Sequence, residues 1–210
     1  MFSVANIFPS MIGIFELDSK WLTVAQEFQN VKLKGEDYQG QRQQYGDVSE
    51  STYVLDTEEF LEFKKELTHH TNYFLTDVLC KKQSNLKITQ SWISVKRQGQ
   101  YHETHRHPNS IVSGVYYWQD GVMPIVFEKD YMSDLHIDDD WDKMKENPQA
   151  YNKQYVPVAK NTLLLFQSSM KHGVEPNTSN EDRYSLAFNT FPTLLGNEQT
   201  LTELNIDNLK

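Results

Sequence analysis

Two histidines with one residue between them, His105 and His107, are the residues of this sequence best suited to hold a metal ion. Side chains alternate between the two faces of an extended segment, so both imidazoles would point the same way and could bind one ion. A third ligand could come from His172, which follows the apolar run Leu163–Phe166 and would approach from another strand. We therefore predict a catalytic metal site formed by these three histidines.

An arginine, Arg183, lies 11 residues after His172 and begins a strand-like segment that runs to Phe188. Its guanidinium group is a rigid, two-pronged donor for a carboxylate. We expect this group at the floor of the same site. The alternative for Arg183 is an ion pair at the protein surface.

The elements that would position these side chains follow residue 87. From there the chain consists of short segments rich in β-branched and aromatic residues, separated by Gly, Pro, Asn and Asp. Eight short strands after a helical beginning predict an all-β core with flanking helices (α+β), as in a double-stranded β-helix or cupin-like jelly-roll. The expected strands are 87–97, 101–107, 110–119, 122–128, 154–158, 161–168, 172–175 and 183–191.

Two helices are expected before these strands. Apolar residues at near-helical spacing predict a short helix over 19–31. The sequence Asp56-Thr-Glu-Glu59 has the form of a capping box, and the apolar residues after it predict a longer helix as far as Leu79.

The composition indicates one globular domain. A chain of 210 residues can bury one sizeable core, and its 38% hydrophobic and 12% aromatic residues are typical of a folded, soluble protein. We expect a single domain over residues 1–210, with a helical N-terminal support over 1–86 and the β core over 87–210.

The charge argues against nucleic acid as a partner. The 29 acidic residues outnumber the 20 basic ones and give a net charge of -9, whereas nucleic-acid-binding surfaces are basic. A local basic patch around Lys96, Arg97 and Arg106 stays open. The acidic run Asp134–Asp142 does not have calcium-loop spacing and is interpreted as solvated, within a loop over about 129–153 that is placed to act as a lid.

The sequence also predicts a cytoplasmic protein with no membrane partner. No run approaches the roughly 20 apolar residues of a membrane helix. The apolar N-terminal segment lacks an early Lys or Arg and is interrupted by Pro9, which argues against a cleaved signal. Cys80 is the only cysteine, which excludes an internal disulfide and fits a reducing compartment; we expect it to be a buried structural thiol.

Five short motifs follow one another in the second half of the chain: Trp92–Val95, Gly99–Asn109, Ser113–Trp118, Leu164–His172 and Arg183–Asn189. In this order and spacing they resemble the 2-oxoglutarate/Fe(II)-dependent oxygenases, in particular an incompletely characterised branch common in tailed phages and marine bacteria. The resemblance covers roughly residue 87 to the end.

The resemblance implies an enzyme that uses Fe(II), 2-oxoglutarate as cosubstrate, and O2. In the wider superfamily the iron ligands follow the pattern His-x-Asp/Glu and a distal His, with an Arg about ten residues later; His105, His172 and Arg183 match. His107 stands in the carboxylate position, although the branch that the chain resembles also uses His-x-His. A neutral imidazole there would leave the iron site one charge unit more positive.

Nearby acids therefore stay open as the third ligand in place of the second histidine. The candidates are Glu103, Glu128 and Asp130. Glu103 is the best of them because strand parity puts it on the same face as the two histidines. The same parity places His102 on the opposite face, which makes it a weaker candidate.

For the cosubstrate, the resemblance implies a salt bridge from Arg183 to the distal carboxylate of 2-oxoglutarate. Ser185, two residues further on and so on the same strand face, would donate a hydrogen bond beside it. Tyr117 joins them by resemblance, because the second tyrosine of a Tyr-Tyr pair reaches that carboxylate in related hydroxylases. The alternative for Tyr117 is a core aromatic residue whose hydroxyl is satisfied locally.

The implied reaction is hydroxylation of an unidentified small molecule or protein side chain, with release of succinate and CO2. Two other functions stay open. A cupin-like three-histidine iron dioxygenase would not use 2-oxoglutarate, and Arg183 and Ser185 would bind the carboxylate of its substrate. A non-catalytic jelly-roll module, such as a phage structural protein, would hold no ordered metal.

Overall fold

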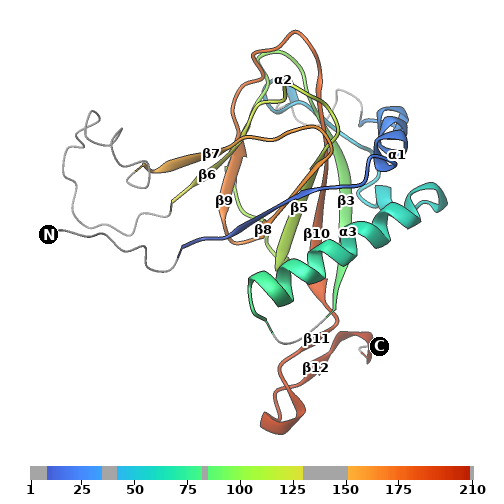
Figure 1. Ribbon diagram of the computed structural model, residues 1–210, viewed down its shortest axis with the longest axis vertical. Coiled ribbons are helices and arrows are strands. Elements are labelled where there is room, and N and C mark those ends of the chain that lie inside the picture. The colour runs from blue at the N-terminus through green and yellow to red at the C-terminus, as the bar shows by residue number, and fades with distance from the viewer. Residues whose placement is uncertain (1–8, 35–41, 82–84, 130–150, 209–210) are drawn as a thin grey trace, which may run out of the picture.

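The computed structural model describes residues 9–34, 42–81, 85–129 and 151–208, whose strands form two antiparallel sheets and a C-terminal hairpin (Figure 1). In spatial order, the larger sheet contains β1 (Ile12–Glu16), β8 (Thr162–Gln167), β5 (Val112–Tyr117), β10 (Arg183–Pro192), β3 (Leu86–Lys96) and β2 (Asp47–Val48). The smaller sheet contains β4 (His102–His105), β9 (Lys171–Val174), β6 (Ile125–Glu128) and β7 (Lys153–Val156). The hairpin pairs β11 (Leu194–Leu195) with β12 (Leu204–Asn205).

These sheets confirm the predicted jelly-roll fold with flanking helices. Each of the eight predicted strands is present, as β3 to β10, within a few residues of its expected bounds. Their pairing is long-range, since β10 lies between β3 and β5, and β8 lies between β5 and β1. Residues far apart in the sequence are thereby brought side by side on one sheet.

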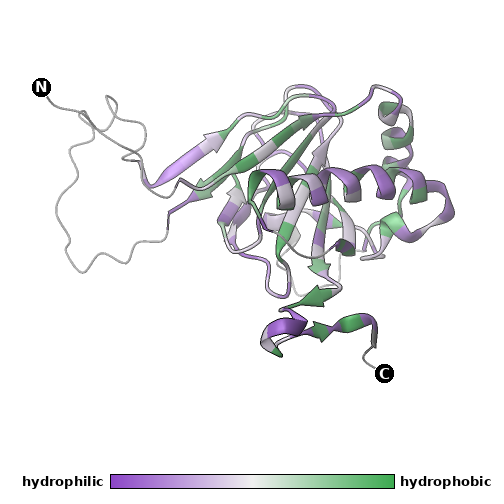
Figure 2. Cartoon of the chain, turned by 60° about the horizontal axis from the view of Figure 1, so that its bottom comes forward, coloured by the Kyte–Doolittle hydropathy of each residue, from purple (hydrophilic) through white to green (hydrophobic). Residues whose placement is uncertain are grey.

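The helices lie mainly before β3. The longest, α3 (Leu61–Tyr73), continues into a π-helical turn, η4 (Phe74–Val78), and crosses one face of the larger sheet (Figure 1). It carries hydrophilic and hydrophobic residues along its length (Figure 2), and the buried ones are Phe63, Leu67 and Thr71. The shorter helices are α1 (Trp21–Glu27), η1 (Phe28–Asn30), α2 (Arg42–Tyr45), η2 (Val54–Asp56), η3 (Glu58–Phe60), η6 (Glu198–Thr200) and η7 (Ile206–Asn208).

The predicted capping box does not start the long helix. Thr57 is extended and separates two 3-10 turns, so α3 begins only at Leu61. The carboxylate of Asp56 instead forms an ion pair with Lys64 on the first turn of α3. The Asp56 side chain thus contacts the helix through Lys64 and does not cap its N-terminus.

Alternation along the strands of the larger sheet separates two hydrophobic clusters. Toward the helices, Tyr116, Leu186 and other strand residues pack with Phe63 of α3. On the opposite face, which we call the inner face, Tyr117 of β5 packs with Phe127 of the smaller sheet. The sequence neighbours Tyr116 and Tyr117 therefore belong to different layers, as the period of a strand requires.

Beside its helices, the N-terminal part of the chain adds two strands to the larger sheet. β1 pairs along the whole of β8, with Ile14 opposite Leu164, and β2 pairs with β3. Ile12-Gly-Ile-Phe15 alternates in the manner of a strand, and Gly13 lets Phe74 approach; a Cβ at Gly13 would lie 2.9 Å from the Phe74 ring.

Two further expectations are addressed by the described residues. Cys80 is exposed, not buried, since the chain leaves the helix there with a φ of 51°. Within the described ranges, the helices are too short or too polar to span a bilayer. The acidic run Asp134–Asp142, and residues 130–150 of the predicted lid, lie outside the described residues.

Candidate metal centre

The three predicted histidines come together at one end of the smaller sheet. Their ligand nitrogens all lie within 4.8 Å of one another. His105 on β4 is directly opposite His172 on β9, and His107 follows β4, where its backbone N–H donates to the Ser168 carbonyl. The Nε2 atoms of His107 and His172 are 3.1 Å apart.

This geometry suits a metal ion held by imidazoles. Nitrogen ligands lie about 2.0–2.1 Å from a first-row metal, so two neighbouring ligands at a right angle are roughly 3 Å apart. The 3.1 Å separation of the two Nε2 atoms matches that value. The rings need no large rearrangement to share one ion.

Backbone carbonyls fix the orientation of two of the rings. The Nδ1 atom of His105 is 2.8 Å from the carbonyl oxygen of Glu103, and that of His172 is 3.0 Å from the carbonyl of Met170. An Nδ1–H that donates to a carbonyl leaves the Nε2 lone pair free for a metal. Both rings are therefore held in the tautomer that binds through Nε2.

Burial also keeps these rings uncharged. Desolvation, with smaller contributions from the neighbouring imidazoles, lowers the pKa of His172 to about 3 and that of His107 to about 4. Desolvation lowers the pKa of His105 as well. At neutral pH the three imidazoles are neutral, and a metal ion does not have to displace protons from them.

A fourth histidine, His102, lies beside the three, contrary to the expectation from strand parity. In the pairing of β4 with β9, His102 is opposite Val174 and His105 is opposite His172. The segment of β4 between these pairs is one residue longer than that of β9, so β4 contains a bulge there. The rings of His102 and His105 consequently lie 4.2 Å apart, edge to face, on the same side. Burial lowers the pKa of His102 to about 3.

The acids that were left open as the third ligand have other partners. The carboxylate of Glu103 hydrogen-bonds the hydroxyl of Tyr45, whose pKa it raises. Glu128 accepts from Thr104 and pairs with Lys171. Neither acid joins the histidine group, which contains no carboxylate among the described residues. Asp130 lies outside the described residues.

The predicted carboxylate-binding residues also converge, on the inner face of the larger sheet. Arg183 is 4% exposed, and its Nη2 donates to the Tyr117 hydroxyl over 3.2 Å. Its Nε is buried with no hydrogen-bond partner. Burial raises the pKa of Tyr117, and the positive charge of Arg183 partly offsets this effect. Arg183 is thus a buried donor and not a surface ion pair.

Ser185 is placed as expected, two residues along β10 and on the same face as Arg183. It is directly opposite Ser94 of β3. Trp92, on the same face of β3, lies near the metal end, with its ring 5.8 Å from that of His107. The inner face therefore connects the histidines to the arginine.

One residue of this face was not identified as functional from the sequence. Lys96 was grouped with Arg97 and Arg106 as a local basic patch, but it is 5% exposed and directly opposite Arg183. The signal was the alternation of β3, in which Lys96 shares a face with Ser94 and Trp92 while Ile93 and Val95 enter the cluster beneath the helices.

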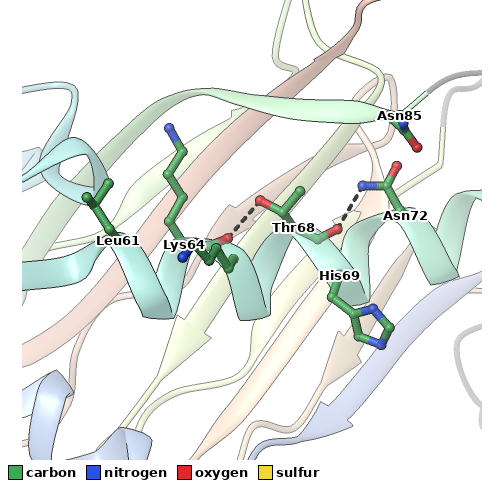
Figure 3. A pocket seen from close by; sticks show the side chains of 7 residues that line it. Leu61, Lys64, Thr68, His69, Asn72 and Asn85 are labelled. Carbon is green, nitrogen blue, oxygen red and sulfur yellow. Dashed lines mark hydrogen bonds between the residues drawn. The ribbon is translucent and has the colours of Figure 1, made fainter. Parts of the chain in front are cut away.

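A separate surface hollow of about 520 Å³ lies along α3 and has a different character (Figure 3). Its lysines, Lys64 and Lys65, are paired with acidic residues. The side chains of Thr68 and Asn72 donate to backbone carbonyls of the helix itself. Most of the polar side chains that line this hollow are therefore already bonded within the protein.

Residues 90–189 match the family described as "Putative 2OG-Fe(II) oxygenase". HygX from Streptomyces hygroscopicus, solved with nickel, 2-oxoglutarate and hygromycin B, superimposes with a TM-score of 0.59 at 9% identity, covering 88% of this chain and 84% of that one. A Pseudomonas putida prolyl-4-hydroxylase gives 0.56 at 12% identity, with 87% and 94% covered.

The non-heme α-ketoglutarate-dependent epimerase SnoN from nogalamycin biosynthesis is also similar, with a TM-score of 0.60 at 10% identity and coverage of 88% and 80%. A search of curated proteins found no match.

Over residues 90–189 the chain is similar to the 2-oxoglutarate/Fe(II)-dependent oxygenases, and its fold is similar to the solved structures above. The resemblance predicted from the motifs is thereby confirmed, since the matched segment 90–189 contains the three histidines, Tyr117 and Arg183. The tailed-phage and marine-bacterial branch stays a prediction.

Proposed function

We propose that this chain is a 2-oxoglutarate- and Fe(II)-dependent dioxygenase that hydroxylates an organic substrate and releases succinate and CO2. The observation that carries the proposal is the convergence of three neutral imidazoles near the buried, incompletely bonded guanidinium of Arg183. A metal site on the smaller sheet and a carboxylate site on the facing side of the larger sheet suit a 2-oxo acid that bridges them.

In this proposal His105, His107 and His172 hold the iron through their Nε2 atoms. Three protein ligands on one side of the ion leave positions for the keto and carboxylate oxygens of the cosubstrate and for O2. Bound Fe(II) supplies the redox chemistry that couples O2 to the decarboxylation of 2-oxoglutarate. The chain contributes the position and the uncharged state of the three rings.

Arg183, Ser185 and Tyr117 bind the far end of the cosubstrate. The free Nε of Arg183 is a donor for a carboxylate oxygen, and the Tyr117 hydroxyl holds the guanidinium in place over 3.2 Å. Because the guanidinium is buried, water does not compete for its hydrogen bonds, and the interaction is stronger than at the surface.

The substrate is proposed to be a small molecule or a protein side chain. The similar structures are named for hygromycin B, for a prolyl residue and for nogalamycin biosynthesis, and one of them is an epimerase. Product analysis with candidate substrates separates hydroxylation from epimerisation by a gain of 16 mass units, the mass of one oxygen atom.

The test is an anaerobic titration of the metal-free protein with Fe(II) and then 2-oxoglutarate, followed by visible absorption of the iron–2-oxo acid chelate. We expect a band that saturates near one iron per chain, weaker in Arg183→Ala and absent or altered in His107→Ala. Lys87→Met is the matched control, because Lys87 is an exposed cation of β3 whose partner is Asp207.

Two other results of this titration would contradict the proposal. Bound iron without the band, at saturating 2-oxoglutarate, would contradict the proposal and favour a three-histidine dioxygenase that does not use this cosubstrate. This second function is favoured by one observation, the all-imidazole donor set. Failure to bind iron at all would point to a non-catalytic jelly-roll module.

A further inference from the structure

A second buried cation, Lys96, lies beside Arg183 on the inner face of the larger sheet. The two residues are directly opposite each other on β3 and β10, so their side chains leave the sheet on the same side. Both are almost completely buried, at 5% and 4% exposed. Two neighbouring buried cations are rare in a protein interior unless an anion accompanies them.

The ammonium group of Lys96 points into the candidate site. Its Nζ donates to the Ser94 hydroxyl over 2.7 Å, one residue pair nearer to the metal end of the sheet. Further along the same face of β3, the Trp92 ring lies 5.8 Å from the His107 ring. The ammonium group is therefore turned toward the end of the sheet that faces the histidines.

The described residues do not neutralise this pair of charges. The acid with the clearest influence on Lys96 is Asp47 of β2, but its carboxylate is bound by Arg97. Arg183 donates to the neutral hydroxyl of Tyr117 and keeps its Nε without a partner. Among the described residues, no carboxylate forms an ion pair with Lys96 or Arg183, so an anionic ligand is needed to balance them.

We propose that Lys96 is a second cationic contact for the 2-oxo acid, whose distal carboxylate binds between Lys96 and Arg183. This inference rests on the proposed function and deepens it, because it assigns a residue that selects the cosubstrate. The hydroxyls of Ser94, Ser185 and Tyr117 complete the surroundings of that carboxylate. The site is thus specific for 2-oxo acids that carry a second negative charge at the far end.

The test compares two ligands by calorimetry on the Fe(II)-loaded protein without oxygen. One is 2-oxoglutarate, and the other is 2-oxopentanoate, which has the same chain length and chelating end but no distal carboxylate. We expect Lys96→Met to raise the Kd for 2-oxoglutarate about 10- to 100-fold, the usual effect of losing a buried charged hydrogen bond. The Kd for 2-oxopentanoate should change little, because that ligand has nothing for Lys96 to bind.

Two further variants make the comparison decisive. Lys96→Gln keeps a polar tip and removes the charge, and we expect it to give the same selective loss. Lys87→Met is the matched control, because Lys87 lies on the same strand but is exposed and paired with Asp207. It should leave both Kd values unchanged.

The outcomes separate this inference from the proposed function. If the protein binds 2-oxoglutarate and Arg183→Ala weakens it, but both Lys96 variants bind within about twofold of wild type, the inference is wrong and the proposed function stands. An equal loss for both ligands would also overturn it, since the effect would then come from the chelating end. If iron-loaded wild type does not bind 2-oxoglutarate, both fail.

Discussion

Replacing Lys96 by methionine should make the ligand-free protein more stable while it weakens cosubstrate binding. Burial, with a contribution from the charge of Arg183, lowers the pKa of Lys96 from 10.5 to about 8. At about 1.4 kcal/mol per pKa unit, keeping this lysine charged in the folded state costs about 3 kcal/mol. Because Lys96 is 5% exposed, solvent screening reduces this value little.

Methionine removes the charge and keeps most of the apolar stem. The lost hydrogen bond to Ser94 subtracts about 1 kcal/mol, so the expected gain in the free energy of unfolding is about 2 kcal/mol. In a chain of this size, that gain corresponds to a rise in Tm of roughly 4–8 °C.

The pH dependence gives this prediction a second readout. The folded pKa of Lys96 lies below the unfolded value, so the folded state releases the proton first as the pH rises. The wild type carries the full cost below pH 8 and loses it between about pH 8 and 10.5. The difference in stability between Lys96→Met and wild type should therefore shrink across that window.

The assay is urea unfolding of the metal-free protein at pH 7 and pH 9.5, followed by circular dichroism, with Lys87→Met as the control for a generic loss of charge. Added Fe(II) and 2-oxoglutarate should stabilise the wild type more than Lys96→Met. A Lys96→Met protein that folds normally but is less stable than wild type by about 1 kcal/mol or more would refute the reasoning, because Lys96 would then contribute to the fold itself.

Three other predictions concern the two sheets. Burial lowers the pKa of His172 to about 3 and of His107 to about 4, so the metal-free protein is fully stable above about pH 6.5 and loses stability as the pH drops toward those values. With nearly 2 kcal/mol from each ring, its free energy of unfolding in urea should fall by about 4 kcal/mol between pH 7 and 5, and a flat profile would contradict this prediction. Tyr117→Phe removes the hydroxyl that holds Arg183 and should raise the Kd for 2-oxoglutarate by about 10-fold in calorimetry; an unchanged Kd would exclude this positioning role. In Gly114→Ala the new Cβ would overlap the Phe188 ring, so the free energy of unfolding should fall by about 1–3 kcal/mol and Tm should fall with it. A Tm within a degree of wild type would mean that the ring moves aside freely.

The placement of Lys96 and Arg183 also explains why the inner face is polar at one end and apolar at the other. Around Tyr117, strand residues of both sheets form a small hydrophobic cluster, which includes Phe127 and Phe166. Next to it, the polar side chains of Ser94 and Ser185 are directly opposite each other.

Much of the fold and site could be predicted from the sequence, because the signals are local. The alternation of apolar and polar residues located the eight strands of the two sheets, and the spacing of His105 and His107 placed two imidazoles together. The strand-like segments around His172 and Arg183 marked these two residues as partners from distant parts of the chain, and the family resemblance added Tyr117. Contacts between side chains from distant segments depend on which strands pair with each other. The order of the motifs along the chain indicated this strand pairing through the family resemblance.

The sequence by itself determined the donor set: three histidines, an arginine and a tyrosine on strands of a jelly-roll. Only the tertiary structure decided how these side chains are arranged. The bulge in β4 turned His102 toward the metal end and removed the parity argument for Glu103. The pairing of β3 with β10 buried Lys96 against Arg183. Bulges and strand partners follow from long-range packing, which no local pattern of residues specifies.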